Sequence, residues 1–92
     1  MSGEKWYVVC LKGVKVDIEN EKLVKGIIKG LAEDLQEDVQ IIGSNGSFDR
    51  YIFKIYATAD RTETFASMAL MRLDDFGLTT HNRTFFAYTY VE

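Results

Sequence analysis

The side chains best suited to chemistry are few in this sequence and lie far apart. His81 is the only histidine, and it stands beside Asn82 and Arg83 with no cysteine at metal-ligand spacing. This context favours a solvated loop histidine, and a ligand or general-base role is the alternative. No serine has a nucleophile-elbow context. The sequence therefore predicts neither a catalytic triad nor a metal site.

Three pairs of acidic residues are the remaining candidates for acid–base chemistry. They fall at or near expected helix ends or just before an expected strand, and they are Glu33-Asp34, Glu37-Asp38 and Asp74-Asp75. Calcium-loop spacing is missing, so we interpret them as caps and surface charge. The segment from Gly43 to Gly46 lacks the lysine of a phosphate-binding loop. We predict no catalytic residues and no cofactor.

Length and composition set the class of protein. Ninety-two residues, 47% hydrophobic and 27% charged, suit a single domain over residues 1–92. The net charge of -3 is spread along the chain, which argues against a nucleic-acid partner. There is no signal peptide and no apolar run long enough to span a membrane. The one cysteine, Cys10, cannot form an internal disulfide, and we expect it to be a buried, unreactive thiol. We therefore predict a cytoplasmic protein, and we expect no membrane partner.

Four strands and two helices are predicted. Strands are expected at Trp6–Val16, Val39–Ile42, Tyr51–Thr58 and Thr84–Val91. The first helix follows the candidate caps Asp17 and Asn20 and carries an apolar stripe from Leu23 to Leu35. The second begins at a capping box, Asp60 to Glu63, with aspartate as the cap, and ends at Gly77-Leu78.

The turn Ser44-Asn45-Gly46-Ser47 predicts a tight hairpin between the second and third strands. If Asn45 and Gly46 are the loop, Ile41 lies opposite Arg50 and Val39 opposite Ile52. The order β-α-β-β-α-β predicts an α+β ferredoxin-like two-layer sandwich, a four-stranded antiparallel sheet with two helices on one face.

Both faces of this sheet are expected to be apolar, although one should face water. We assign to the helix side Val8, Cys10, Ile42, Phe53, Ile55, Phe85, Ala87 and Val91. We assign to the open side Tyr7, Val9, Leu11, Val39, Ile41, Arg50, Ile52, Lys54, Tyr56, Phe86, Tyr88 and Tyr90. Monomers rarely expose such a patch, so we predict a homo-oligomer, with shielding by loops as the alternative.

Part of the chain resembles RNA-recognition motifs. The run from Trp6 to Leu11 is similar to their first conserved strand, and Tyr51 and Phe53 fall where that family's third strand carries aromatics. The resemblance implies base stacking on the sheet. Asp49 and Arg50 depart from it, because they stand where a basic residue and a glycine are expected.

Size, element order and the doubly apolar sheet also resemble two other ferredoxin-like groups. One is the ACT-type regulatory domains, which bind small effectors at subunit interfaces; their aspartate-x-proline-glycine turn is missing at Asp17-Ile18-Glu19-Asn20. The other is the dimeric α+β-barrel proteins, which include small cofactor-independent oxygenases and use the space between helices and sheet as a pocket.

From the residues we predict a small non-enzymatic module that uses an apolar, aromatic open sheet face to bind a small molecule or a protein, and that forms a homodimer. The expected binding residues are Tyr7, Lys54, Tyr56, Tyr88 and Tyr90. The alternatives are an RNA-binding sheet of the RNA-recognition type and a small cofactor-independent enzyme of the dimeric α+β-barrel type.

Overall fold

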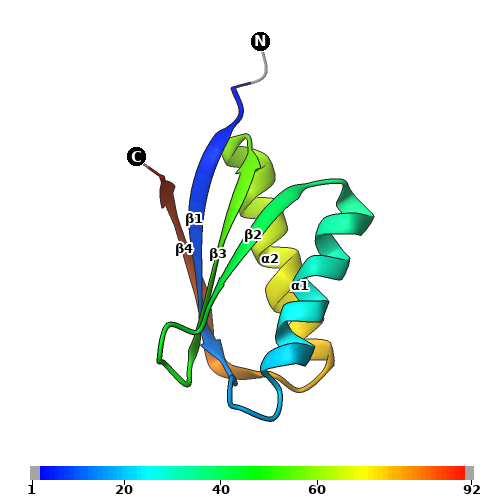
Figure 1. Cartoon of the computed structure of the whole chain (residues 1–92), viewed down its shortest axis with the longest axis vertical. Coiled ribbons are helices and arrows are strands. Elements are labelled where there is room, and N and C mark those ends of the chain that lie inside the picture. The colour runs from blue at the N-terminus through cyan, green and yellow to red at the C-terminus, as the bar shows by residue number, and fades with distance from the viewer. Residues whose placement is uncertain (1–2, 91–92) are drawn as a thin grey trace.

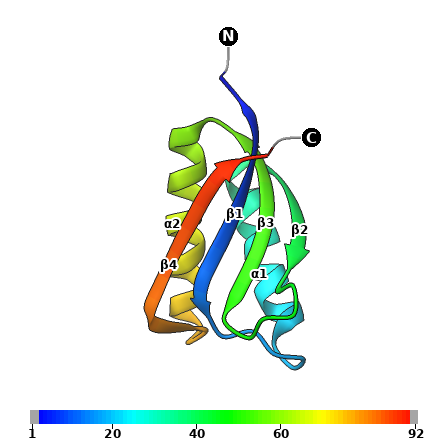
Figure 2. The ribbon, with the colours of Figure 1, turned by 90° about the vertical axis from the view of Figure 1, so that its left-hand side faces the viewer.

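The order of the elements along the chain is the predicted one. The structure, a computed structural model, describes residues 3–90. Its elements are β1 (Lys5–Val14), α1 (Glu21–Leu35), β2 (Asp38–Gly43), β3 (Arg50–Ala57), α2 (Ala59–Asp75) and β4 (Thr79–Thr89). The strands form an antiparallel sheet in the order β2-β3-β1-β4 (Figure 1). Both helices cover the same face of that sheet (Figure 2), which confirms the ferredoxin-like fold.

The ends of α2 agree only in part with the predicted signals. Its N-cap is Thr58 rather than Asp60, because the Thr58 hydroxyl accepts the backbone N–H of Arg61 at 3.2 Å. Asp60 lies in the first turn, where its charge favours the helix dipole. At the other end Gly77 has a φ of 71°, and the N–H of Leu78 donates to the carbonyl of Leu73 at 2.9 Å. This left-handed stop is the one predicted.

The register of the β2–β3 hairpin differs from the prediction. Asn45 and Gly46 do form the turn, with φ angles of 54° and 79° and a Ser47 N–H to Ser44 carbonyl bond of 3.1 Å. However, Ile41 pairs with Phe53, three residues beyond the predicted Arg50. The strands do not resume directly after the turn, because Gly43 forms a bulge and β3 starts only at residue 50.

The shift is three residues, an odd number, so each side chain of β2 lies on the opposite face of the sheet from the predicted one. The side chains of β1 also lie on the opposite faces from those predicted. Five residues assigned to the open side face the helices: Tyr7, Val9, Leu11, Val39 and Ile41. Three assigned to the helix side lie on the open side: Val8, Cys10 and Ile42. The assignments in β3 and β4 are correct, except that Val91 lies outside the described residues. Cys10 is consequently half-buried rather than enclosed.

The hydrophobic core fills the layer between the helices and the sheet. Phe53 and Phe65 meet edge to face, with ring centroids 5.5 Å apart, and both are fully buried. The apolar stripes of the two helices supply the rest of this layer, through Val24, Ile28, Leu31, Ala66, Ala69 and Leu73. Among residues 3–90, no helix is long and apolar enough to cross a membrane.

Candidate functional site

A small pocket is lined by two segments at one end of the helix–sheet layer; these two loops lie at the foot of Figure 1. It lies between the segment that leads into α1 and the β2–β3 loop, which the bond from the Val16 N–H to the Phe48 carbonyl, 3.1 Å, holds together. We call it the lower pocket; its volume is about 210 Å³, and it is lined by Val16, Asp17, Ile18, Glu21, Ser44, Gly46, Ser47 and Phe48. Its lining is mostly apolar.

Glu21 is the acidic side chain of this pocket with a second contact in the core. It is the first residue of α1, it lines the lower pocket, and it is half-buried.

The second contact of Glu21 is with the hydroxyl of Tyr51. Tyr51 is fully buried under the helices and is not one of the residues that line the lower pocket. Burial raises the pKa of Tyr51 to about 12, and the nearby Glu21 carboxylate adds to the rise through its negative charge and as an acceptor for the phenol. The phenol therefore keeps its proton at neutral pH, and Glu21 connects the pocket with the buried core.

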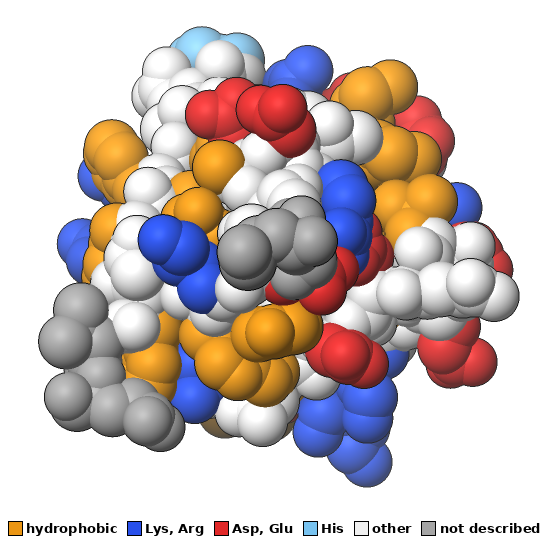
Figure 3. Space-filling view, turned by 90° about the horizontal axis from the view of Figure 1, so that it is seen from above, with side chains coloured by type: hydrophobic (Ala, Val, Ile, Leu, Met, Phe, Trp, Pro, Cys, Tyr) orange, Lys and Arg blue, Asp and Glu red, His pale blue; other side chains and the backbone are white. Residues whose placement is uncertain are grey.

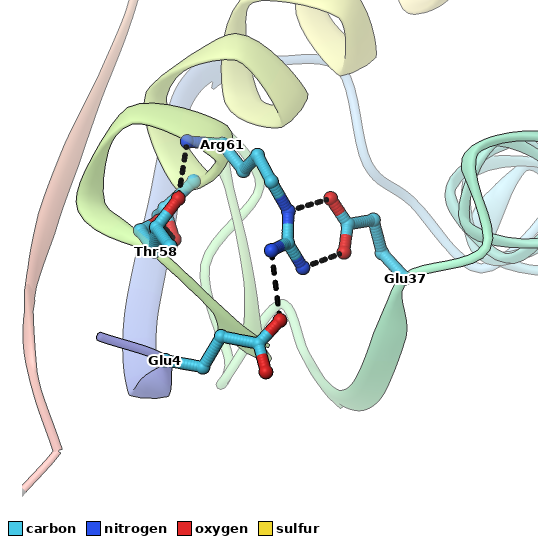
Figure 4. A network of polar contacts seen from close by, with 5 residues as sticks. Glu4, Glu37, Thr58 and Arg61 are labelled. Carbon is cyan, nitrogen blue, oxygen red and sulfur yellow. Dashed lines mark hydrogen bonds and ion pairs between the residues drawn. The ribbon is translucent and has the colours of Figure 1, made fainter. Parts of the chain in front are cut away.

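The opposite end of the layer holds a network of ion pairs. The Arg61 guanidinium donates to both carboxylate oxygens of Glu37, at 2.9 and 2.6 Å, and to Glu4 at 2.7 Å (Figure 4). These bonds raise the pKa of Arg61 above its already high value. Seen from this end, acidic and basic side chains are interspersed (Figure 3). The arrangement joins the residue before β1, the α1–β2 connection and α2, so we assign it a structural role.

The helix-free side of the sheet is the third region of interest. We call it the open sheet face, and it comprises Trp6, Val8, Cys10, Lys12, Ile42, Ile52, Lys54, Tyr56, Phe86, Tyr88 and Tyr90. Ile42, Phe86 and Tyr88 are each more than half exposed. The predicted apolar face therefore exists, although partly from other residues than those named from the sequence.

Lys54 lies among aromatic rings on this face. Its Nζ is 4.2 Å from the centroid of the Tyr90 ring and 5.6 Å from that of Trp6, which itself lies 5.5 Å from Tyr56. No acidic side chain pairs with Lys54 among residues 3–90. The rings stabilise its charge in place of a carboxylate.

Four of the five predicted binding residues lie together. Lys54, Tyr56, Tyr88 and Tyr90 are all on the open sheet face. Tyr7 is on the other face, packed against the core, because β1 has the opposite orientation to the predicted one. The structure thus separates Tyr7 from the group.

The remaining candidates are solvent-exposed or buried away from ligands. His81 is exposed, and no group of three or more potential metal ligands lies together in the described ranges. Tyr51 and Phe53, on which the likeness to RNA-recognition motifs rested, are fully buried under the helices. They cannot stack on bases, so that alternative loses its supporting observation.

Glu21 and Tyr51 were not selected from the sequence as site residues. Glu21 reads only as a helix-dipole charge, and Tyr51 only as one aromatic among several apolar strand residues. They are thirty positions apart, with no motif between them. Only the tertiary fold brings the first residue of α1 near the hydroxyl of Tyr51.

Comparison with known proteins yields a structural likeness. No family model matches the chain, and no curated protein matches it. A solved protein from Nitrosomonas europaea, provisionally named an antibiotic biosynthesis monooxygenase, has the same fold with a TM-score of 0.57. The likeness covers 99% of this chain and 93% of that one, at 12% identity.

This comparison overturns the prediction of a non-enzymatic module. The fold that the chain shares is that of a protein named as an enzyme, which contradicts that prediction. The sequence-based preference rested on the apolar side chains of the open sheet face, and such a face by itself does not distinguish a binding module from an enzyme.

Proposed function

We propose that this chain is a small cofactor-independent enzyme of the dimeric α+β-barrel type, an oxygenase that acts on an organic substrate in the lower pocket. The observation that carries this proposal is the half-buried Glu21 carboxylate, which lines the lower pocket and interacts with the buried hydroxyl of Tyr51. The shared fold with a protein named as a monooxygenase supports the reaction class. Fold by itself does not determine function, so the site carries the proposal.

Glu21 is the proposed general base. A monooxygenase places one atom of O₂ in the substrate and releases the other as water. Without an external reductant the substrate supplies both electrons, so an activated CH₂ becomes C=O and its two hydrogens leave in the water. Removing a C–H proton beside a carbonyl is the step that a positioned carboxylate assists.

Oxindole is a suitable probe substrate, because its CH₂ lies next to a carbonyl and oxidation by O₂ gives isatin and water. We expect oxygen uptake with oxindole, and one ¹⁸O atom in isatin when the gas is ¹⁸O₂. Glu21→Gln should abolish uptake, whereas Glu19→Gln, an exposed neighbour, should not. If the wild-type protein and Glu21→Gln consume oxygen equally across a panel of such carbonyl compounds, the proposal is wrong.

We further propose a cytoplasmic homodimer that associates through the open sheet face. Stacked sheets pack about 10 Å apart, which would bury the exposed aromatic side chains of two copies. Lys54 could then meet an acidic group of the second copy. The lone, half-buried Cys10 supports a reducing compartment.

Sedimentation equilibrium at micromolar concentration tests the dimer. We expect the wild-type protein to sediment as a dimer and Tyr88→Lys to sediment as a monomer, because a charge would be buried in the contact. Met71→Lys is the matched control, since Met71 is an equally exposed apolar residue on α2. A monomeric wild-type protein contradicts the proposal.

A further inference from the structure

We infer that the outer edge of β4 pairs with β4 of a second copy of this chain, so that two sheets join into one continuous antiparallel sheet. This contact uses the edge of the sheet, whereas the proposed homodimer uses the open sheet face. The inference therefore goes beyond the proposed function and does not depend on it.

The backbone of β4 has hydrogen-bonding groups that point away from the sheet. In an antiparallel pair, residues that exchange two backbone hydrogen bonds alternate with residues that exchange none. The N–H of Tyr90 donates to the carbonyl of Trp6, opposite it in the register, at 3.0 Å. Even-numbered residues in the regular part of β4 therefore bond to β1, and the backbone groups of Phe85, Ala87 and Thr89 point outward. Because β4 is the outermost strand (Figure 2), no strand of the described chain satisfies them.

The side chains of β4 leave this edge unprotected. Exposed edges of natural sheets are usually blocked by lysine, proline or a bulge, or are kept very short. The segment from Thr84 to Tyr90 contains no proline and no charged residue, and its pairing with β1 is regular. On the helix side, Ala87 and Thr89 are exposed, so α2 does not cover the outer half of the strand. The edge is therefore open to another strand.

The other edge of the sheet is protected. β2 has only six residues, it begins at the charged Asp38, and it has a bulge at Gly43. A short edge that carries a charge and a bulge is a poor template for pairing. The contrast between the two edges makes β4 the strand that pairs.

A second copy fits this edge because β4 is complementary to itself. A twofold axis through Ala87, at the centre of the uncharged segment, sets Phe85 of one copy opposite Thr89 of the other. Outward donors then meet outward acceptors along the whole segment. The same axis places Phe86 opposite Tyr88 of the second copy on the open sheet face, and such aromatic pairs stabilise antiparallel sheets. No like charges meet, so the contact has the self-complementarity that a twofold interface requires.

Hydrogen exchange of the wild-type protein tests the pairing directly. One strand edge buries less surface than a sheet face, so we expect edge pairing at millimolar concentration and a free edge at micromolar concentration. The amides of Phe85, Ala87 and Thr89 should exchange about tenfold more slowly at the higher concentration. The amides of Phe86 and Tyr88, which bond to β1, are the internal control and should exchange slowly at both concentrations. Equally rapid exchange of the outward amides at both concentrations overturns the inference.

Ala87→Pro tests the same contact by sedimentation equilibrium at millimolar concentration. Proline removes an N–H that points outward and leaves the bonds to β1 in place. The twofold axis makes the substitution remove two hydrogen bonds, so the dissociation constant of the edge contact should rise about tenfold. Ala87→Ser keeps the N–H and is the matched control, which should associate as the wild type does. Equal association of Ala87→Pro and the wild type contradicts the inference; if Ala87→Pro fails to fold, the exchange rates of the wild-type protein decide.

The edge contact and the proposed face contact fail in distinguishable ways. With both contacts, dimers at micromolar concentration join into tetramers at millimolar concentration. With the edge contact alone, monomers join into dimers, and this step still depends on the N–H of Ala87. Outward amides that stay exposed in the protein alone, but become protected when a peptide of alternating threonine and valine is added, would assign the edge to a peptide partner and overturn the pairing of two copies.

Discussion

The two ends of the helix–sheet layer treat their polar groups in opposite ways. At one end, Arg61 makes three hydrogen bonds to the carboxylates of Glu37 and Glu4 (Figure 4). At the other end, the Glu21 carboxylate lines the lower pocket, and no lysine or arginine pairs with it in the described part of the chain. The carboxylates of the first end are bound to a cation, whereas the carboxylate of the second end is open to a ligand.

This difference separates a structural role from the proposed functional one. At the first end, one guanidinium and two carboxylates tether three segments. At the second end, a half-buried carboxylate without a cation is available for chemistry. We therefore propose the lower pocket as the functional site, and the following experiments test that contrast.

The largest expected effect is the loss of turnover on removing the base at the lower end. Glu21→Gln should reduce oxygen-dependent oxidation by about 10²–10⁴-fold, the usual contribution of a general base. Single-turnover assays with oxindole measure this loss, and far-ultraviolet circular dichroism checks that the fold is retained. A reduction of less than threefold would remove Glu21 from the mechanism.

Tyr51→Phe tests the interaction between the buried hydroxyl and Glu21. The variant keeps the ring in the core and removes a hydrogen-bond donor from a half-buried carboxylate, so the free energy of unfolding should fall by about 1 kcal/mol. Urea denaturation of the variant and the wild type gives this difference directly. Unchanged or raised stability would mean that the two groups do not interact.

Arg61→Ala should have the opposite signature at the upper end. It removes the guanidinium from Glu37, whose side chain is only 8% exposed, so the free energy of unfolding should fall. Arg61→Lys should recover only part of the lost stability, because lysine keeps the positive charge beside Glu37 but cannot make the two parallel hydrogen bonds. Oxidation per folded molecule should stay unchanged in both variants; a change in turnover would assign this end a part in the reaction.

The smallest expected effect is a dependence of stability on alkaline pH. The pKa of Tyr51 rises from 10.0 to about 12 on folding, so the folded protein retains the phenol proton more strongly than the unfolded chain. The resulting stability is complete below pH 10 and is lost as the pH rises toward 12. The difference between wild type and Tyr51→Phe, measured by urea denaturation from pH 9 to 11.5, isolates this contribution. A pH-independent difference would contradict the raised pKa.

Much of the fold could be predicted because its signals are local. The apolar stripe from Leu23 to Leu35, the Asn45-Gly46 turn and the stop at Gly77-Leu78 each depend on residues a few positions apart. The N-cap of α2 was misplaced because Thr58 and Asp60 both suit that position, and the chain direction after β3 decided between them.

The candidate site could not be predicted to the same extent. The tyrosines of β3 and β4 were recognised on the open sheet face, whereas Tyr7 was placed on the wrong side. The pairing of Glu21 with Tyr51 has no counterpart in any local pattern, since it depends on how α1 lies over the sheet.

The sequence by itself determined which segments become helices and strands, their order, and the presence of apolar residues on both sides of the sheet. Tertiary structure decided which side faces the helices. When both faces of a strand are apolar, a shift of one residue exchanges one apolar face for another. The hydrophobic pattern of the sequence therefore cannot show which face packs against the helices. The bulge at Gly43 and the late start of β3 made that choice for β2. The packing of the helices over the sheet then brought the Tyr51 hydroxyl near the Glu21 carboxylate.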